Sequence, residues 1–309
     1  MKRYLFSCLI MALLWGCDKP APAPDYVTGK NRFTLPVDGA TREYYVHVPT
    51  GYSPDVPAPM VIMLHGTGGD GEKFYNISGW KEVGESDNIL TVFPSAEQYC
   101  IIDSGVVKNT TKWNVYNPEY AYCASNTPVD DVKFLRQMIA DLGDRFAVDT
   151  RRIYVVGFSN GGQMAFRCAV DMSDVFAAVV ENAGVSAGDT TYTTPRPLPV
   201  AFQLGNEDDR FFPSAAPLSQ FEAGLTGIPF FQNLASTHCK TFQYQTAYTL
   251  SGDTTTAMIA TYPALTPGDK REFRVVLVKN LPHVYPNGTN HWMRGAELHW
   301  AWMKQYTLP

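Results

Sequence analysis

The sequence lacks several features that mark broad classes of protein. No apolar run reaches the ~20 residues that a helix needs to cross a bilayer. Basic residues are not in excess, since 25 Lys and Arg stand against 30 Asp and Glu, and this argues against a nucleic-acid binder. Charged residues make up only 18 % of the 309 positions and hydrophobic residues 45 %, which argues against intrinsic disorder. The sequence contains neither a C-x-x-C pair nor a P-loop lysine motif.

The first residues have the pattern of a secretory signal. Lys2 and Arg3 precede a short apolar stretch over 4–15, which ends at Gly16 and Cys17. This ending resembles the bacterial lipobox, whose cysteine becomes the lipidated first residue of the mature protein. An ordinary signal cleavage nearby and an uncleaved anchor are the alternatives. The pattern predicts an extracytoplasmic protein that is either secreted or held at a membrane by a lipid on Cys17.

The sequence predicts three parts of the chain. Residues 1–16 form the predicted signal peptide, and residues 17–27 form a Pro-rich tether. Residues 28–309 show no internal repeat or linker and form one predicted domain. In an oxidising compartment, Cys100 and Cys123 are predicted to form a disulfide because they flank one loop region. Cys168 and Cys239 are either free thiols or a second pair.

Strand and helix patterns alternate along this domain, which predicts an α/β fold with a mostly parallel sheet and helices on both faces. Met60–Leu64 and Ile153–Val156 are continuous apolar runs, as is typical of strands buried on both faces. The predicted strands are Arg42–Val48, Met60–Leu64, Ile89–Phe93, Ile153–Val156, Ala177–Val180, Val200–Leu204 and Phe273–Val278. The predicted helices are Asp130–Phe146, Asn160–Val170 and Ala296–Tyr306.

A G-x-S-x-G sequence, Gly157 to Gly161, lies between a predicted strand and a predicted helix. In that setting the serine is held on a sharp turn, and the flanking glycines avoid the collisions that side chains would cause. The alternative is an ordinary Gly-rich turn whose serine has no chemical role. The context predicts that Ser159 is a nucleophile.

A serine nucleophile needs a base, and the base needs a carboxylate that orients it. After the strand Val200–Leu204 the candidate acids include Asp208 and Asp209, and after Phe273–Val278 the candidate base is His283. The spacing of His283 from the two later histidines fits no common metal motif, so no metal site is expected. Upstream, the loop His65–Gly69 can aim the Thr67 N–H at a reacting carbonyl beside the N–H of Asn160.

Several of these segments occur together in one known family. Residues from about Arg42 to Tyr306 resemble the secreted α/β-hydrolase esterases that include polyhydroxybutyrate depolymerases and feruloyl esterases. The resemblance implies an α/β-hydrolase fold and places the acid at Asp208, with Asp209 as the fallback. The family's His-x-Trp-Pro motif falls on His283 to Pro286, with Tyr285 in place of the tryptophan. The matching segments are Tyr44–Pro49, His65–Gly69, Trp113–Asn114, Val129–Val132, Gly157–Gly162, Asp174–Val179 and His283–Pro286.

The combined pattern predicts a serine ester hydrolase that needs no cofactor, with a polyester or a feruloyl- or acetyl-polysaccharide as substrate. Trp113 and Tyr285 are the aromatic side chains expected to contact that substrate. A further aromatic group, Phe211, Phe212, Phe230 and Phe231, is expected either to widen this platform or to pack its own loops. The alternatives are a non-catalytic lipoprotein that binds polysaccharide and a peptidase on the same fold. The expected partners are an ester substrate and, through Cys17 alone, a membrane; nucleic acid is not expected.

Overall fold

The structure is a computed structural model that describes residues 25–116, 120–184 and 190–309. The predicted signal peptide, Cys17 and most of the predicted tether lie outside these residues. The described end of the predicted tether contacts the domain, because the Tyr26 ring centroid lies 4.7 Å from that of Phe146. Among the described residues, no helix is long and apolar enough to cross a membrane.

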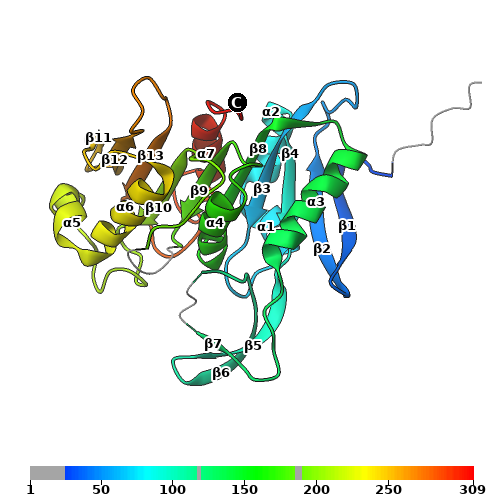
Figure 1. Ribbon diagram of the computed structural model, residues 1–309, viewed down its shortest axis with the longest axis horizontal. Coiled ribbons are helices and arrows are strands. Elements are labelled where there is room, and N and C mark those ends of the chain that lie inside the picture. Colours follow the sequence, from blue (N-terminus) through cyan, green and yellow to red (C-terminus); the bar gives the residue numbers. More distant parts are fainter. Residues whose placement is uncertain (1–24, 117–119, 185–189) are drawn as a thin grey trace, which may run out of the picture.

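Ten strands of the described chain form one large sheet (Figure 1). Its centre is parallel, in the order β4-β3-β8-β9-β10-β13, and antiparallel pairs extend both edges. In spatial order the strands are β1 (Gly29–Val37), β2 (Ala40–Val48), β4 (Leu90–Pro94), β3 (Ala58–Leu64), β8 (Val148–Phe158), β9 (Ala178–Asn182), β10 (Val200–Gly205), β13 (Glu272–Val278), β12 (Ala257–Pro263) and β11 (Thr249–Asp253).

Helices cover both faces of the sheet, and this explains why the central strands are apolar along their whole length. Along β3, alternate side chains enter two separate cores, with Ile62 on one face and Met63 on the other. The first core lies under α3 (Asp131–Arg145), α4 (Asn160–Asp171), α5 (Phe221–Gly227) and α6 (Pro229–Phe242). The second lies under α1 (Gly71–Ile77), α2 (Trp80–Asp87) and α7 (Gly295–Met303). A short 3₁₀ helix, η1 (Leu218–Gln220), precedes α5.

The strand and helix patterns of the sequence are confirmed for the central sheet. Each of the seven predicted strands coincides with one of the ten, and the three predicted helices are α3, α4 and α7 within a few residues. In α3 the Asp130 side chain caps the helix by accepting from the Lys133 N–H at 3.0 Å. The α/β prediction is therefore correct, whereas β1, β11, β12 and helices α1, α2, α5 and α6 were not predicted.

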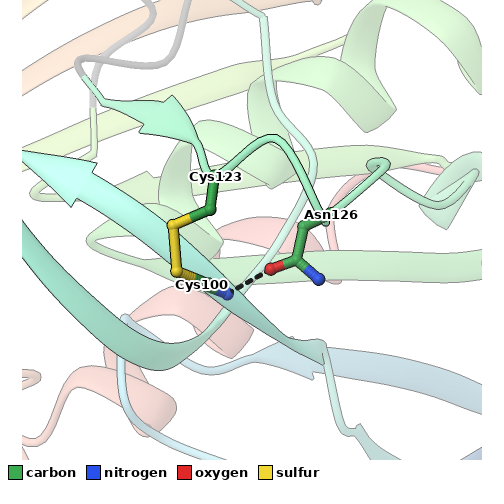
Figure 2. Close-up of a disulfide and its surroundings, with 3 residues drawn as sticks. All are labelled: Cys100, Cys123 and Asn126. Carbon is green, nitrogen blue, oxygen red and sulfur yellow. Dashed lines mark hydrogen bonds between the residues drawn. A yellow bond between two sulfur atoms is a disulfide. The ribbon is translucent and has the colours of Figure 1, made fainter.

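A second, three-stranded sheet projects from one end of the large one (Figure 1). Its strands are β5 (Glu97–Asp103), β6 (Val106–Lys112) and β7 (Ala121–Tyr122). The predicted disulfide is present, since Cys100 on β5 is bonded to Cys123 just after β7 (Figure 2). The Cys100 N–H also donates to the Asn126 side chain at 2.6 Å, and these contacts join the chain after β7 to β5. Cys168 and Cys239 are buried free thiols, which answers the question left open by the sequence.

Candidate active site

The candidate residues lie at the carboxyl edge of the parallel strands, where the order of the sheet changes direction. From β3 the chain proceeds to β4 on one side, and β8 then occupies the other side of β3. Loops that follow such a switch point diverge and leave a crevice between them, which is where ligands bind in open α/β sheets. The loop after β3 carries Thr67, and the turn after β8 carries Ser159.

Ser159 lies in a strained turn between β8 and α4. Its φ of 55° and ψ of −120° fall outside the regions that a side-chain-bearing residue ordinarily adopts. The turn is compact enough that a Cβ on Gly157 would lie 1.8 Å from the Gly161 carbonyl oxygen, and one on Gly161 would lie 2.3 Å from that of Leu64. Both glycines of the motif are thus required by close backbone contacts. Gly184 has the same role, because a Cβ there would lie 1.9 Å from the Ser159 carbonyl oxygen.

A histidine and a carboxylate complete a hydrogen-bonded series with this serine. Ser159 Oγ lies 2.9 Å from His283 Nε2, and His283 Nδ1 lies 2.7 Å from Asp208 Oδ2. Asp208 is fully buried after β10, and the Arg210 N–H donates to its other oxygen at 3.1 Å. With the imidazole proton held on Nδ1 by Asp208, Nε2 is left as an acceptor for the serine hydroxyl. Asp209, the fallback acid, points to solvent with 85 % of its side chain exposed.

The Gly-rich loop after β3 lies against the serine turn. A Cβ on Gly66 would be 3.2 Å from Ser159 Cβ, so the two segments are in contact. Among the described groups, the backbone N–H groups of Thr67 and Asn160 have no hydrogen-bond acceptor. The Asn160 N–H also begins α4, where the helix dipole favours negative charge. Both are therefore available to an external oxygen.

His65 holds the base of this loop and has no catalytic geometry. Its Nδ1–H donates to the Gly66 carbonyl at 2.7 Å, and its Nε2 accepts from the Ala96 N–H at 3.0 Å. Burial lowers the pKa of His65 to about 4, so the ring is neutral near pH 7.

Trp113 has a position different from the one predicted. The side chain is fully buried, its indole N–H donates to the His65 carbonyl at 2.9 Å, and its backbone N–H donates to the Asn160 side chain at 2.7 Å. The next residue is fixed as well, because the Asn114 N–H donates to Asp131 Oδ2 at 2.7 Å. Asp131 in turn forms a buried ion pair with Arg42 at 2.7 Å. The expected substrate contact of Trp113 is wrong, and its observed role is to hold the Gly-rich loop against α4.

Tyr285 fixes the loop that carries His283. Its hydroxyl accepts from the Trp80 indole N–H at 2.9 Å and lies 3.0 Å from His299 Nδ1. His299 Nε2 lies 3.1 Å from the Gln203 side-chain oxygen, so the series ends on β10. Tyr285 therefore anchors the His283 loop to the core, and only part of its ring reaches the cavity described next.

A cavity of about 420 Å³ opens above Ser159 and His283. Its apolar side includes Phe74 and Phe158, and Thr67 and Tyr285 also line it. The sequence pattern missed the charged side chains that also line it, which are Lys73, Asp103, Lys108, Lys112 and Arg210. The second aromatic group lies elsewhere: Phe211, Phe212, Phe230 and Phe231 pack on one another with ring centroids 5.0 to 6.2 Å apart.

The sequence is similar to several curated esterases over about half of its length. A Nocardia uniformis protein with the name "Putative esterase NocK" is 30 % identical over 62 % of this chain and 50 % of its own. Feruloyl esterase B of Piromyces equi is 27 % identical over 54 % of this chain and 29 % of its own. Poly(3-hydroxybutyrate) depolymerase of Ralstonia pickettii is 27 % identical over 50 % of this chain and 31 % of its own. The chain thus spans half or less of the length of these relatives.

The fold and a family model agree with this similarity. The acetyl xylan esterase of Aspergillus awamori superposes with a TM-score of 0.60 at 15 % identity, over 89 % of this chain and 99 % of its own. At that identity the likeness concerns the fold alone. The model of the prolyl oligopeptidase family matches residues 123–308, which include the serine turn and the loops that carry Asp208 and His283. The chain therefore belongs to the prolyl oligopeptidase family and has the α/β-hydrolase fold.

Proposed function

We propose that this protein is a serine ester hydrolase with Ser159 as nucleophile, His283 as base and Asp208 as the orienting acid. The observation that carries the proposal is the continuous hydrogen-bonded series from Asp208 through His283 to Ser159, at 2.7 and 2.9 Å. These lengths lie within hydrogen-bond reach, as proton transfer from the serine requires.

In the proposed reaction, Ser159 Oγ attacks the carbonyl carbon of the ester while its proton passes to His283 Nε2. The negative charge that develops on the carbonyl oxygen is stabilised by the N–H groups of Thr67 and Asn160. The C–O bond then breaks, and His283 returns the proton to the leaving alcohol. Water, deprotonated by His283, then attacks the acyl carbon of the acyl-enzyme. The bond between that carbon and Ser159 Oγ breaks, His283 returns the proton to Oγ, and the acid is released. The chain's own residues supply each of these steps without a cofactor.

The relatives' names support esters as the substrate class. Feruloyl esterases, an acetylxylan esterase and polyhydroxyalkanoate depolymerases are among them, so we propose polysaccharide-linked or polyester substrates. The family name favours a second candidate, a peptidase, because the matched model is that of prolyl oligopeptidases. Comparing the turnover of an ester with that of the corresponding peptide distinguishes an esterase from a peptidase.

The test is labelling with a fluorophosphonate together with turnover of a feruloyl, an acetyl-xylan and a hydroxybutyrate ester. We expect one label per chain, at Ser159, and a loss of turnover of about 10³-fold or more in Ser159→Ala, with the melting temperature unchanged. A purified Ser159→Ala protein with near wild-type turnover would remove Ser159 from the mechanism. A wild-type protein that is neither labelled nor active would favour the non-catalytic binder.

We also propose that residues 1–16 are a signal peptide, that residues 17–27 form a tether ahead of the catalytic domain, and that Cys17 carries lipid. The Cys100–Cys123 disulfide supports an oxidising compartment. Two or more acyl chains on one cysteine would anchor the protein stably, whereas one chain binds a membrane only marginally. We expect the wild-type protein in the membrane fraction at high salt and Cys17→Ser in the soluble fraction or unprocessed. Soluble wild-type protein whose N-terminus follows Cys17 would exclude the lipid anchor.

A further inference from the structure

One wall of the cavity is formed by one face of the β5–β6 hairpin. Side chains alternate between the two faces of a strand, so residues two apart share a face. Lys108, Thr110 and Lys112 on β6 all line the cavity, and so do Ile101 and Asp103 on β5. Their regular spacing shows that a whole strand face is directed at the site.

This hairpin is joined to the loop that carries the candidate oxyanion donor. The Gly68 N–H donates to the Thr111 carbonyl at 3.0 Å, and the Thr111 hydroxyl donates to the Gly69 carbonyl at 2.5 Å. The β5–β6 hairpin and the Gly-rich loop are therefore hydrogen-bonded neighbours, and the lysines of β6 line the same cavity as Ser159 and His283.

Positive charge dominates the described lining of the cavity. Four cationic side chains (Lys73, Lys108, Lys112 and Arg210) line it with one carboxylate, Asp103, which pairs with Lys108 at 3.1 Å. Within the described ranges, no carboxylate lies within 4.0 Å of the Lys73 ammonium, and Arg210 meets Asp209 only at 4.0 Å with both side chains exposed. The chain as a whole has a formal net charge of −5, so this positive cavity is a local feature. A cavity lined by positive charge attracts and orients a negatively charged ligand.

We infer that the ester hydrolysed at Ser159 carries a carboxylate on its acyl or its alcohol part, which the lysine face of β6 and Lys73 bind. The inference rests on the proposed esterase function and specifies its substrate class. The apolar side of the cavity would hold the uncharged part of the same substrate, and the volume of about 420 Å³ accommodates an aromatic or short aliphatic ester. Each lysine is partly exposed to solvent, so the preference is expected to be moderate and sensitive to salt.

The test compares two matched pairs of esters with the full-length protein. One pair, 4-carboxyphenyl acetate and 4-carbamoylphenyl acetate, places the charge on the alcohol part. The other, monophenyl glutarate and phenyl 4-carbamoylbutyrate, places it on the acyl part. Each kcat/KM is divided by the rate of hydroxide-catalysed hydrolysis of the same ester, so intrinsic reactivity cancels. We expect the anionic member to be preferred by about tenfold in at least one pair at ~0.01 M salt, with the preference lost near 1 M salt.

Variants identify which lysines produce the preference. Lys108→Gln/Lys112→Gln and, separately, Lys73→Gln should each lower the anionic-to-neutral ratio several-fold. Lys304→Gln, at the end of α7 and outside the cavity, should leave that ratio unchanged and serves as the matched control. Equal turnover of both members of both pairs would overturn the inference and leave the esterase proposal intact. Absence of turnover for all four esters, together with no fluorophosphonate label at Ser159, would overturn the proposed function and this inference with it.

Discussion

Replacing Asp208 by Asn tests the assignment of the acid against its neighbour in the sequence. The two carboxylates have opposite environments, since Asp208 is fully buried and Asp209 has 85 % of its side chain exposed. Asn at position 208 keeps the size of the side chain and an oxygen that can accept from the Arg210 N–H. It removes the negative charge that holds the imidazole proton on Nδ1, so Nε2 can carry the proton instead and can no longer accept from Ser159.

The expected size of the effect follows from that tautomer change. In serine proteases the same substitution lowers kcat about 10⁴-fold, which corresponds to about 5.5 kcal/mol at 1.36 kcal/mol per decade. We expect a loss of similar order for Asp208→Asn. Asp209→Asn removes only an exposed ion pair at 4.0 Å and should change kcat by less than about threefold.

The assay is kcat on one activated neutral ester, measured for the wild type and both variants at the same pH. Melting temperatures accompany the rates, because a charge-assisted hydrogen bond also contributes about 1.5–3 kcal/mol to folding. A folded Asp208→Asn protein that retains wild-type kcat, or a larger loss in Asp209→Asn, would refute this assignment. Either result would mean that Asp208 is not the acid that orients His283 during the reaction.

Two further predictions concern stability. The Cys100→Ser/Cys123→Ser protein should lose about 3 kcal/mol of unfolding free energy, because the disulfide closes a loop over a separation of 23 residues. The measurement is unfolding in urea, and an unchanged midpoint would show that the bond hardly constrains the unfolded chain. Burial lowers the pKa of His299 to about 3, whereas the unfolded value is near 6.5. Between these values only the unfolded chain binds the proton, so the unfolding free energy should fall as pH decreases below about 6.5, by up to about 1.4 kcal/mol per pH unit for this group. His299→Gln should flatten that dependence between pH 6 and 4, and identical slopes for variant and wild type would contradict the assignment.

The parts of the site that depend on local sequence could be predicted, and the parts that depend on side-chain direction could not. The strand, turn and helix around Ser159 are contiguous, and the close contacts of Gly157 and Gly161 allow no other residue there. Asp208 and Asp209 differ by one position, so only the path of the loop after β10 separates a buried acid from an exposed one. Trp113 shows the same limit. Its residue type is typical of a surface that binds aromatic or sugar groups, but its indole N–H donates to the His65 carbonyl inside the core.

The cavity wall could not be predicted for a related reason. β6 is mostly exposed and polar, so its sequence resembles a solvated loop, and its lysines resemble the other surface lysines of the chain. Their significance appears only when the hairpin is placed beside the Gly-rich loop. By contrast, Asp131 lies in a segment that the family resemblance marks, Val129–Val132, although its buried pair with Arg42 and its support of Asn114 required the structure.

The three-stranded sheet shares no strand pairing with the ten-stranded sheet within the described residues. The proposed reacting groups, Ser159, Asp208 and His283, are supplied by loops of the large sheet, whereas the lysine face of the cavity is supplied by the small one. Insertions or exchanges in β5–β7 can therefore alter which esters are accepted while the hydrogen-bond ladder that supports Ser159 stays intact. The hairpin is a separable module for redesign: a graft that keeps the Thr111 contacts to the Gly-rich loop and the Cys100–Cys123 bond could carry a neutral or acidic face in place of the lysines.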